Sequence, residues 1–185
     1  YTLSPVEPHY PIVSGVAVSE ALAGFLPGVE VSLKWPNDVI SCRKKLSGIL
    51  CESTGGIIAV GVGVNVNQIS WPAGLAHRSV SMRELAGREF DLDEVMRGVT
   101  EHIAHWVSRY REEGFEPVRK AFLSRGRLAG LDVCDDRGSP CVVCNLTDEG
   151  HLVIETTSGR RVLVTESLSI GWEEESKETP GFGGA

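Results

Sequence analysis

The sequence predicts an α+β protein in which a mixed β-sheet flanked by helices is followed by a small β-barrel. Two patterns in the first two thirds of the chain support the sheet and its helices. Apolar residues recur at helical spacing in residues 12–25 and 92–110. They alternate with polar residues at a period of two in residues 29–34, as in a strand with one buried face.

The barrel is predicted by a change of pattern near Gly126. Beyond it, short alternating segments are separated by the turn sequences Asp-Arg-Gly, Asp-Glu-Gly and Ser-Gly. We therefore expect a first domain over residues 1–126 and a barrel over residues 127–172. Residues 173–185 are acidic and rich in Gly and Pro, so we expect a disordered tail.

The first predicted elements are a helix and a strand. Apolar side chains in residues 12–25 form one helical stripe, and Pro27-Gly28 ends the helix. In residues 29–34, Val, Val and Leu alternate with Glu, Ser and Lys, so the polar face of this strand ends at Lys34.

A hairpin and a further strand follow. Residues 46–52 are expected to form a strand that pairs with residues 39–40 across a polar turn. Residues 57–64 are almost wholly apolar apart from their glycines, which predicts a central strand covered on both faces.

Helices are predicted for the middle of the chain. Residues 81–86 start helically, and Asp91 is placed to cap the long helix that carries the second apolar stripe. Residues 115–122 predict a third helix. Core packing explains these apolar stripes, so we assign them no binding role.

Composition excludes several classes of function. The 185 residues carry a net charge of −7 with scattered basic residues, which argues against binding nucleic acid. The sequence contains neither an apolar run of membrane-span length nor a secretory leader, so we expect a cytoplasmic protein without a membrane partner. The chain begins at Tyr1 within an apolar, strand-like stretch, and we expect it to be the later part of a longer protein.

Three short runs between Lys34 and Asn65 carry the chemistry. They are Lys-Trp-Pro-Asn-Asp at 34–38, Lys-Leu-Ser-Gly-Ile-Leu at 45–50 and Gly-Val-Gly-Val-Asn at 61–65. Two lysines, two amides, a carboxylate and backbone-exposing glycines on adjacent strands suit an anionic ligand. The Gly-x-Gly is no dinucleotide fingerprint, because the third glycine and the helix are missing.

These runs, in this order and spacing, resemble those of biotin protein ligases, and the similarity extends over residues 1–172. The resemblance implies a class II synthetase-like catalytic fold followed by an SH3-like barrel. It also implies a two-step reaction in which biotin and ATP form biotinyl-5′-AMP, and a specific lysine of a biotin carboxyl carrier protein or domain then takes the biotin. The carrier would belong to a biotin-dependent carboxylase. A lipoate-type ligase and a catalytically inactive module that binds a carrier domain are the alternatives.

Residue roles carried over from the resemblance centre on Lys45 and Asp38. Lys45 matches the catalytic lysine that holds biotin carboxylate and phosphate together, although a solvated surface lysine, or the neighbouring Lys44, is the alternative. Asp38 matches an acidic residue that organises this lysine or binds Mg²⁺. An Asx turn after proline also explains Asn37-Asp38.

The remaining roles concern the two substrates. For ATP, the resemblance implies Asn65 at the adenine edge, with Asn37 and Lys34 nearby; Asn37 also fits a scaffolding role. For biotin, it implies contacts beside Lys45 from the following residues: Gly48, Ile49, Gly61 and Gly63. Trp35 is left open between a ligand contact and a buried structural tryptophan.

One departure from the family is the absence of its Gly-Arg-Gly-Arg-x-Gly-Arg loop. The loop would lie upstream of Tyr1, as would the residues that bind the biotin head, so we expect this segment alone to be inactive or very weak. The resemblance also allows a homodimer through a sheet edge. Nothing in this segment indicates a nucleic-acid partner.

Overall fold

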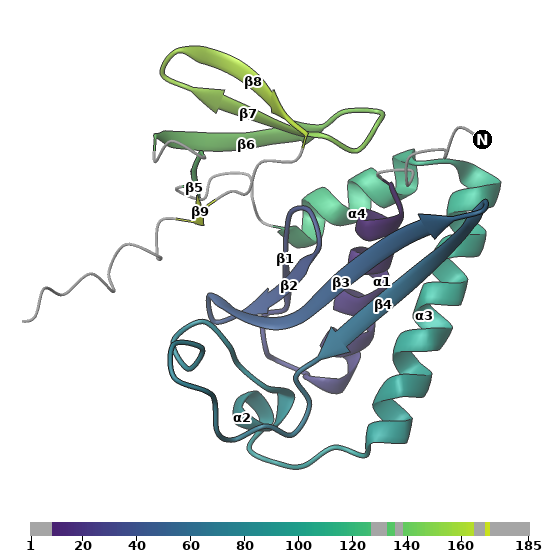
Figure 1. The fold of residues 1–185 in the computed structure, drawn as a ribbon, viewed down its shortest axis with the longest axis vertical. Helices are drawn as coiled ribbons and strands as arrows, with labels where there is room; N and C mark the ends of the chain where they lie inside the picture. Colours follow the sequence, from purple (N-terminus) through teal and green to yellow (C-terminus); the bar gives the residue numbers. More distant parts are fainter. Residues whose placement is uncertain (1–8, 127–132, 136–138, 165–168, 171–185) are drawn as a thin grey trace, which may run out of the picture.

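A computed structural model describes residues 9–126, 133–135, 139–164 and 169–170 of the chain (Figure 1). The first part contains four helices and four strands in the order α1, β1 to β4, α2 to α4. Their bounds are α1 His9–Phe25, β1 Ser32–Lys34, β2 Asp38–Ser41, β3 Lys44–Thr54, β4 Ile57–Val64, α2 Met82–Ala86, α3 Leu92–Glu113 and α4 Glu116–Gly126. The predicted α+β class and its order of elements are confirmed.

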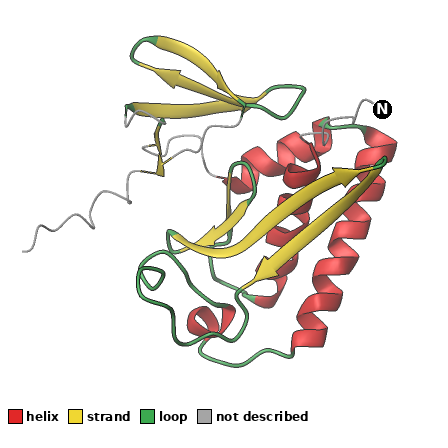
Figure 2. Ribbon diagram, in the orientation of Figure 1, coloured by secondary structure: helices red, strands yellow, loops and turns green. Residues whose placement is uncertain are grey.

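The first sheet has the strand order β1-β2-β3-β4, and every pairing between these strands is antiparallel. We expected a mixed sheet; within the described residues, the parallel pairing is the isolated bridge between Lys45 and Ser79. Figures 1 and 2 show α1, α3 and α4 on one face of this sheet, with the opposite face left open. The main core lies between that sheet and the helices, around buried residues such as Val16, Leu33 and Val99.

The prediction of a central, doubly covered strand over residues 57–64 is wrong in its environment, although the bounds are right. Among the described strands β4 lies at the edge of the sheet, and its residues alternate between exposed and half-buried. Ile57, for example, is 73% exposed. The apolar run was misleading because three of the four residues on the open face are the small residues Ala59, Gly61 and Gly63, which do not need to be covered.

Capping residues set the bounds of the helices that follow. At α2, the Ser81 hydroxyl accepts a hydrogen bond from the backbone N–H of Glu84, and the Glu84 carboxylate accepts one from the backbone N–H of Ser81. Asp91 caps α3 as predicted, accepting from the backbone of Glu94 at 3.0 Å. None of the helices in the described ranges is both long and apolar enough to cross a membrane.

A second antiparallel sheet follows α4, in the strand order β8-β7-β6-β5-β9. Its strands are β5 Val133–Cys134, β6 Pro140–Leu146, β7 Leu152–Thr156, β8 Gly159–Leu163 and β9 Ser169–Ile170. Alternating residues of β6 and β7 form its buried face, including Val143 and Ile154. The SH3-like assignment and the domain limits stay predictions, and the tail at 173–185 lies outside the described residues.

Candidate active site

A β-bulge determines where Lys45 points. The turn between β2 and β3 consists of Cys42 and Arg43, both with positive φ, which is the geometry of a two-residue hairpin. In the next pairs Ile40 faces Lys45 but Val39 faces Ser47, so Leu46 is an extra residue. Leu46 and Ser47 are both buried. The bulge therefore brings Lys45 to the open face that Gly48 also occupies, whereas strict alternation would separate them.

Lys45 forms an ion pair with Asp38, with Nζ and Oδ1 2.6 Å apart. The lysine side chain is 49% exposed, so the ammonium group stays accessible from solvent. Gly48 makes this arrangement possible. A Cβ atom added there would lie 2.8 Å from Lys45 Cε and 2.9 Å from Nζ, closer than real Cβ contacts come. Lys45 thus lies across the glycine, with Asp38 at its end.

The strand register aligns four of the proposed site residues in one row across the sheet. Lys34 pairs with Asp38, Asp38 with Gly48, and Gly48 with Gly63. Residues directly opposite one another share a face, so this row lies on the open face. The three sequence runs, which are separated along the chain, therefore meet at one place.

A shallow groove of about 510 Å³ occupies this part of the open face. Its lining residues come from the turn of residues 35–37 between β1 and β2, which we call the site turn, and from β3 and β4: Asn37, Lys45, Gly48, Ile49, Leu50, Gly61, Val62 and Gly63. The side chain of Ile49 is buried against the helices, so Ile49 meets the groove through its backbone. The apolar side chain on the open side is that of Leu50, which is 62% exposed. Leu50 was not among the site residues predicted from the sequence, although it lies two residues from Gly48 and so shares its face.

The side-chain amides of Asn37 and Asn65 form hydrogen bonds with backbone groups of the strands around the site. Asn37 donates through its side-chain Nδ2 to the backbone carbonyl of Ile49 at 2.8 Å. The backbone carbonyl of Asn37 accepts from the backbone N–H of Ile49 at 2.9 Å. Asn65 donates through Nδ2 to the carbonyls of Lys45 and Val80, at 3.0 and 3.2 Å. A ligand contact by either amide nitrogen would have to replace or share one of these bonds.

Two neighbours of the site residues point elsewhere. Lys44 Nζ donates to the carbonyl of Ala76 at 3.1 Å, away from Asp38. Trp35 is only 3% exposed and donates through Nε1 to the carbonyl of Gly150 in the second sheet. Of the two roles left open for Trp35, its position fits the buried structural one.

The described residues provide few side chains that could bind a metal ion. They contain no group of three or more His, Cys, Asp or Glu side chains placed to hold an ion. Asp38 contributes a single carboxylate, already paired with Lys45. A magnesium site built by protein ligands alone therefore does not fit here.

Comparison with known proteins agrees with this geometry. The model of the biotin/lipoate A/B protein ligase family matches residues 2–68, the segment that holds all three runs. The fold is thus that of the biotin and lipoate ligase class. A biotin–acetyl-CoA-carboxylase ligase of Paracoccus denitrificans is 31% identical in an alignment of 171 positions that covers 86% of this chain and 71% of the relative. The bifunctional ligase/repressor BirA of Bacillus subtilis is 27% identical, with 89% of this chain and 53% of that protein covered.

Solved structures lead to the same family. The biotin protein ligase of Aquifex aeolicus superposes with a TM-score of 0.81 at 30% identity, covering 88% of this chain and 75% of that one. Its complex with biotin and ATP gives a TM-score of 0.78 at 30% identity, covering 88% and 70%. The chain belongs to the biotin protein ligase family.

Proposed function

We propose that the groove on the open face of the first sheet is where biotin and ATP react, and that Lys45 is the catalytic cation. The carrying observation is the Lys45–Asp38 pair over Gly48, at a groove floored by glycine. The comparisons support biotin rather than lipoate, because the Paracoccus relative and the Aquifex structures are named as biotin ligases and one of these structures contains biotin and ATP.

In the first step, a carboxylate oxygen of biotin attacks the α-phosphorus of ATP. The bond from that phosphorus to the bridging oxygen of the β-phosphate breaks, and pyrophosphate leaves with the electron pair. Both reactants are anionic, so a fixed positive charge must lie between them as charge develops. Lys45 supplies that charge, and Asp38 holds its ammonium group in place.

In the second step, the amine of the carrier lysine attacks the acyl carbon of biotinyl-AMP, loses a proton and displaces AMP. The proposed partner is a biotin carboxyl carrier domain, consistent with the carboxylase named for the Paracoccus relative. The open face suits this step, because Lys45 and Leu50 are both reachable from solvent.

The other proposed site residues bind biotin or ATP or shape the groove. Glycines at 61 and 63 keep the floor flat, and Gly48 and Ile49 offer backbone to biotin. For ATP, we propose Lys34, through its place in the cross-sheet row, together with Asn37 and Asn65. Mg²⁺ would arrive with ATP and be held chiefly by phosphate oxygens and water, with Asp38 as one protein ligand, and we assign no step to it.

The test compares two adjacent lysines. We expect Lys45→Ala to lower biotin-dependent pyrophosphate release from ATP by about 10²-fold, the cost of removing one preorganised stabilising group. Lys44→Ala is the matched control and should stay close to wild type, because Lys44 points to Ala76. The assay uses the full encoded protein, with circular dichroism to verify folding.

Normal pyrophosphate release from Lys45→Ala would remove Lys45 from its role. If the unsubstituted protein released no pyrophosphate but still bound a carrier domain, the result would instead favour the inactive binding module.

A further inference from the structure

The indole of Trp35 connects the site turn to the second sheet. Trp35 immediately precedes Pro36, Asn37 and Asp38, and its Nε1 donates to the carbonyl of Gly150 at 3.1 Å. Gly150 belongs to the turn of residues 147–151 between β6 and β7, more than a hundred positions along the chain. Trp35, which belongs to the Lys-Trp-Pro-Asn-Asp run at 34–38, is thus hydrogen-bonded to the C-terminal sheet.

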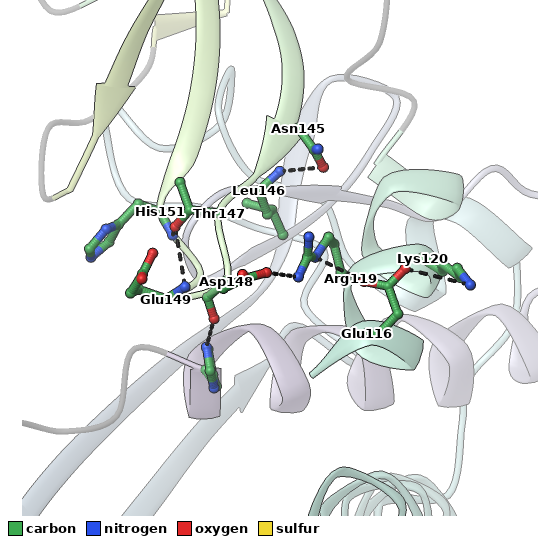
Figure 3. Close-up of polar contacts among 10 residues, drawn as sticks. Glu116, Arg119, Lys120, Asn145, Leu146, Thr147, Asp148, Glu149 and His151 are labelled. Carbon is green, nitrogen blue, oxygen red and sulfur yellow. Dashed lines mark hydrogen bonds and ion pairs between the residues drawn. The ribbon is translucent and has the colours of Figure 1, made fainter. Parts of the chain in front are cut away.

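The same turn is held at two further points by the helices. His9, at the start of α1, contacts the carbonyl of Asp148 through Nε2 and the hydroxyl of Tyr110 through Nδ1, both at 2.7 Å. Its ring stacks on Phe115 with centroids 3.9 Å apart. Arg119 of α4 forms an ion pair with the carboxylate of Asp148, and Figure 3 shows this pair with the 147–151 turn above the helices.

The turn is also internally braced, so it can act as a fixed anchor. The N–H of Thr147 donates to the carbonyl of His151 at 2.8 Å, and the N–H of Gly150 to the carbonyl of Thr147 at 3.0 Å. The Thr147 hydroxyl accepts from the backbone of Glu149 and His151, each at 3.2 Å. Gly150 has φ of 83°, a conformation that favours glycine. The carbonyl that Trp35 contacts therefore has a set position.

From Trp35, a short path leads to the reacting groups. Asn37 is bonded in both directions to Ile49 of β3, and Asp38 pairs with Lys45. We propose that Trp35 is a positioning residue through which the 147–151 turn of the C-terminal sheet fixes the Asp38–Lys45 pair. The inference rests on the proposed function for its effect on catalysis, whereas the mechanical link can be measured without activity.

The first arm of the experiment follows hydrogen exchange in the full encoded protein. Trp35→Phe keeps an aromatic ring but removes the N–H. We expect faster exchange of the Ile49 amide, which donates to Asn37, because the site turn loses its anchor. Trp71→Phe is the matched control, since it removes an indole N–H bonded to Glu84 instead. Unchanged exchange at Ile49 in Trp35→Phe would overturn the inference, whatever the activity.

The second arm measures adenylate formation. Misplacement of a catalytic group by about 1 Å can cost on the order of 10²-fold, so we expect kcat of Trp35→Phe to fall by roughly tenfold or more. The KM for biotin should change little, because Trp35 does not line the groove. A rise in KM with unchanged kcat would contradict positioning. Absence of activity in the unsubstituted protein would refute the proposed function and leave the exchange result to decide this inference.

A pair of remote variants covers the case in which Trp35→Phe fails to fold. Arg119→Gln and Asp148→Asn each break the ion pair at the far side of the turn and touch no site residue. Both should accelerate exchange at Ile49 in the same direction as Trp35→Phe, with a smaller effect. Wild-type exchange at Ile49 in both variants would also overturn the link.

Discussion

At the scale of single residues, the site depends on where side chains are missing. Gly48 leaves the space in which the end of the Lys45 side chain lies, and a larger residue there would make this flexible side chain shift. Gly61 and Gly63 line the groove in which a ligand would lie. A lysine chain that lies flat over a backbone is held at both ends, here by β3 and by Asp38. The position of its charge is therefore set before any ligand binds.

Gly48→Ala tests this dependence. The new methyl group would meet Lys45 Cε at 2.8 Å, so we expect the ammonium group to leave Asp38 and pyrophosphate release to fall. A fall of about 10²-fold is the scale for a displaced catalytic group. Gly24→Ala on α1 is the matched control, because a Cβ there meets nothing within 4 Å. Full activity of Gly48→Ala would show that the observed lysine position is not needed.

At the scale of elements, strand β3 determines which residues face the proposed site, and helix caps stabilise the helices behind the sheet. The bulge at Leu46 sends Lys45 and Gly48 to the same face, while Leu46 joins the core with Ser47. Behind the sheet, α3 buries Val95, Val99 and Trp106, and Asp91 caps the N-terminus of this helix. The cap matters because α3 is the longest helix of the layer that supports β3 and β4.

Asp91→Ala should lower the free energy of unfolding by about 1 kcal/mol, the typical cost of losing an N-cap. The reason is the bond from the Glu94 backbone, which would lose its acceptor. Asp91→Ser should retain most of the stability, because serine also caps well. Denaturant unfolding of the variants gives the measurement. Equal losses for alanine and serine would assign the effect to charge rather than capping.

At the scale of the whole molecule, Glu20 joins three helices. Its carboxylate accepts from Trp106 Nε1 of α3 at 2.5 Å and from Arg125 of α4 at 2.7 Å, while Glu20 itself lies on α1. Glu20 thus connects α1, α3 and α4, the three helices against which the sheet packs. The turn at 147–151 then fastens the second sheet to the same layer through His9 and Arg119.

Glu20→Ala should therefore lower the free energy of unfolding by roughly 1–3 kcal/mol, because two donors lose their acceptor. Glu101→Ala, at an exposed position on α3, is the control and should stay within about 0.5 kcal/mol of wild type. Thermal or denaturant unfolding measures both. A Glu20→Ala protein as stable as the control would mean that the hydrogen bonds of Glu20 are not needed to hold the three helices together.

Much of the fold could be predicted from local pattern. The helix over 12–25, the hairpin before residue 52, the Asp91 cap and the alternating strands near the C-terminus all follow from periodicity and capping, which act over a few residues. The wrong environment of residues 57–64 has a long-range cause. Periodicity records which residues are apolar, but the number of helices covering a sheet depends on distant segments.

The sequence by itself determined the order of elements, the three motif runs and the resemblance to biotin protein ligases, because these depend on residue identity and spacing. The tertiary structure alone decided the alignment of Lys34, Asp38, Gly48 and Gly63 in one row and the attachment of Trp35 to Gly150. The physical reason is strand register. Side chains alternate between faces, so one bulged residue changes which groups meet, and a contact across 115 positions leaves no local signal.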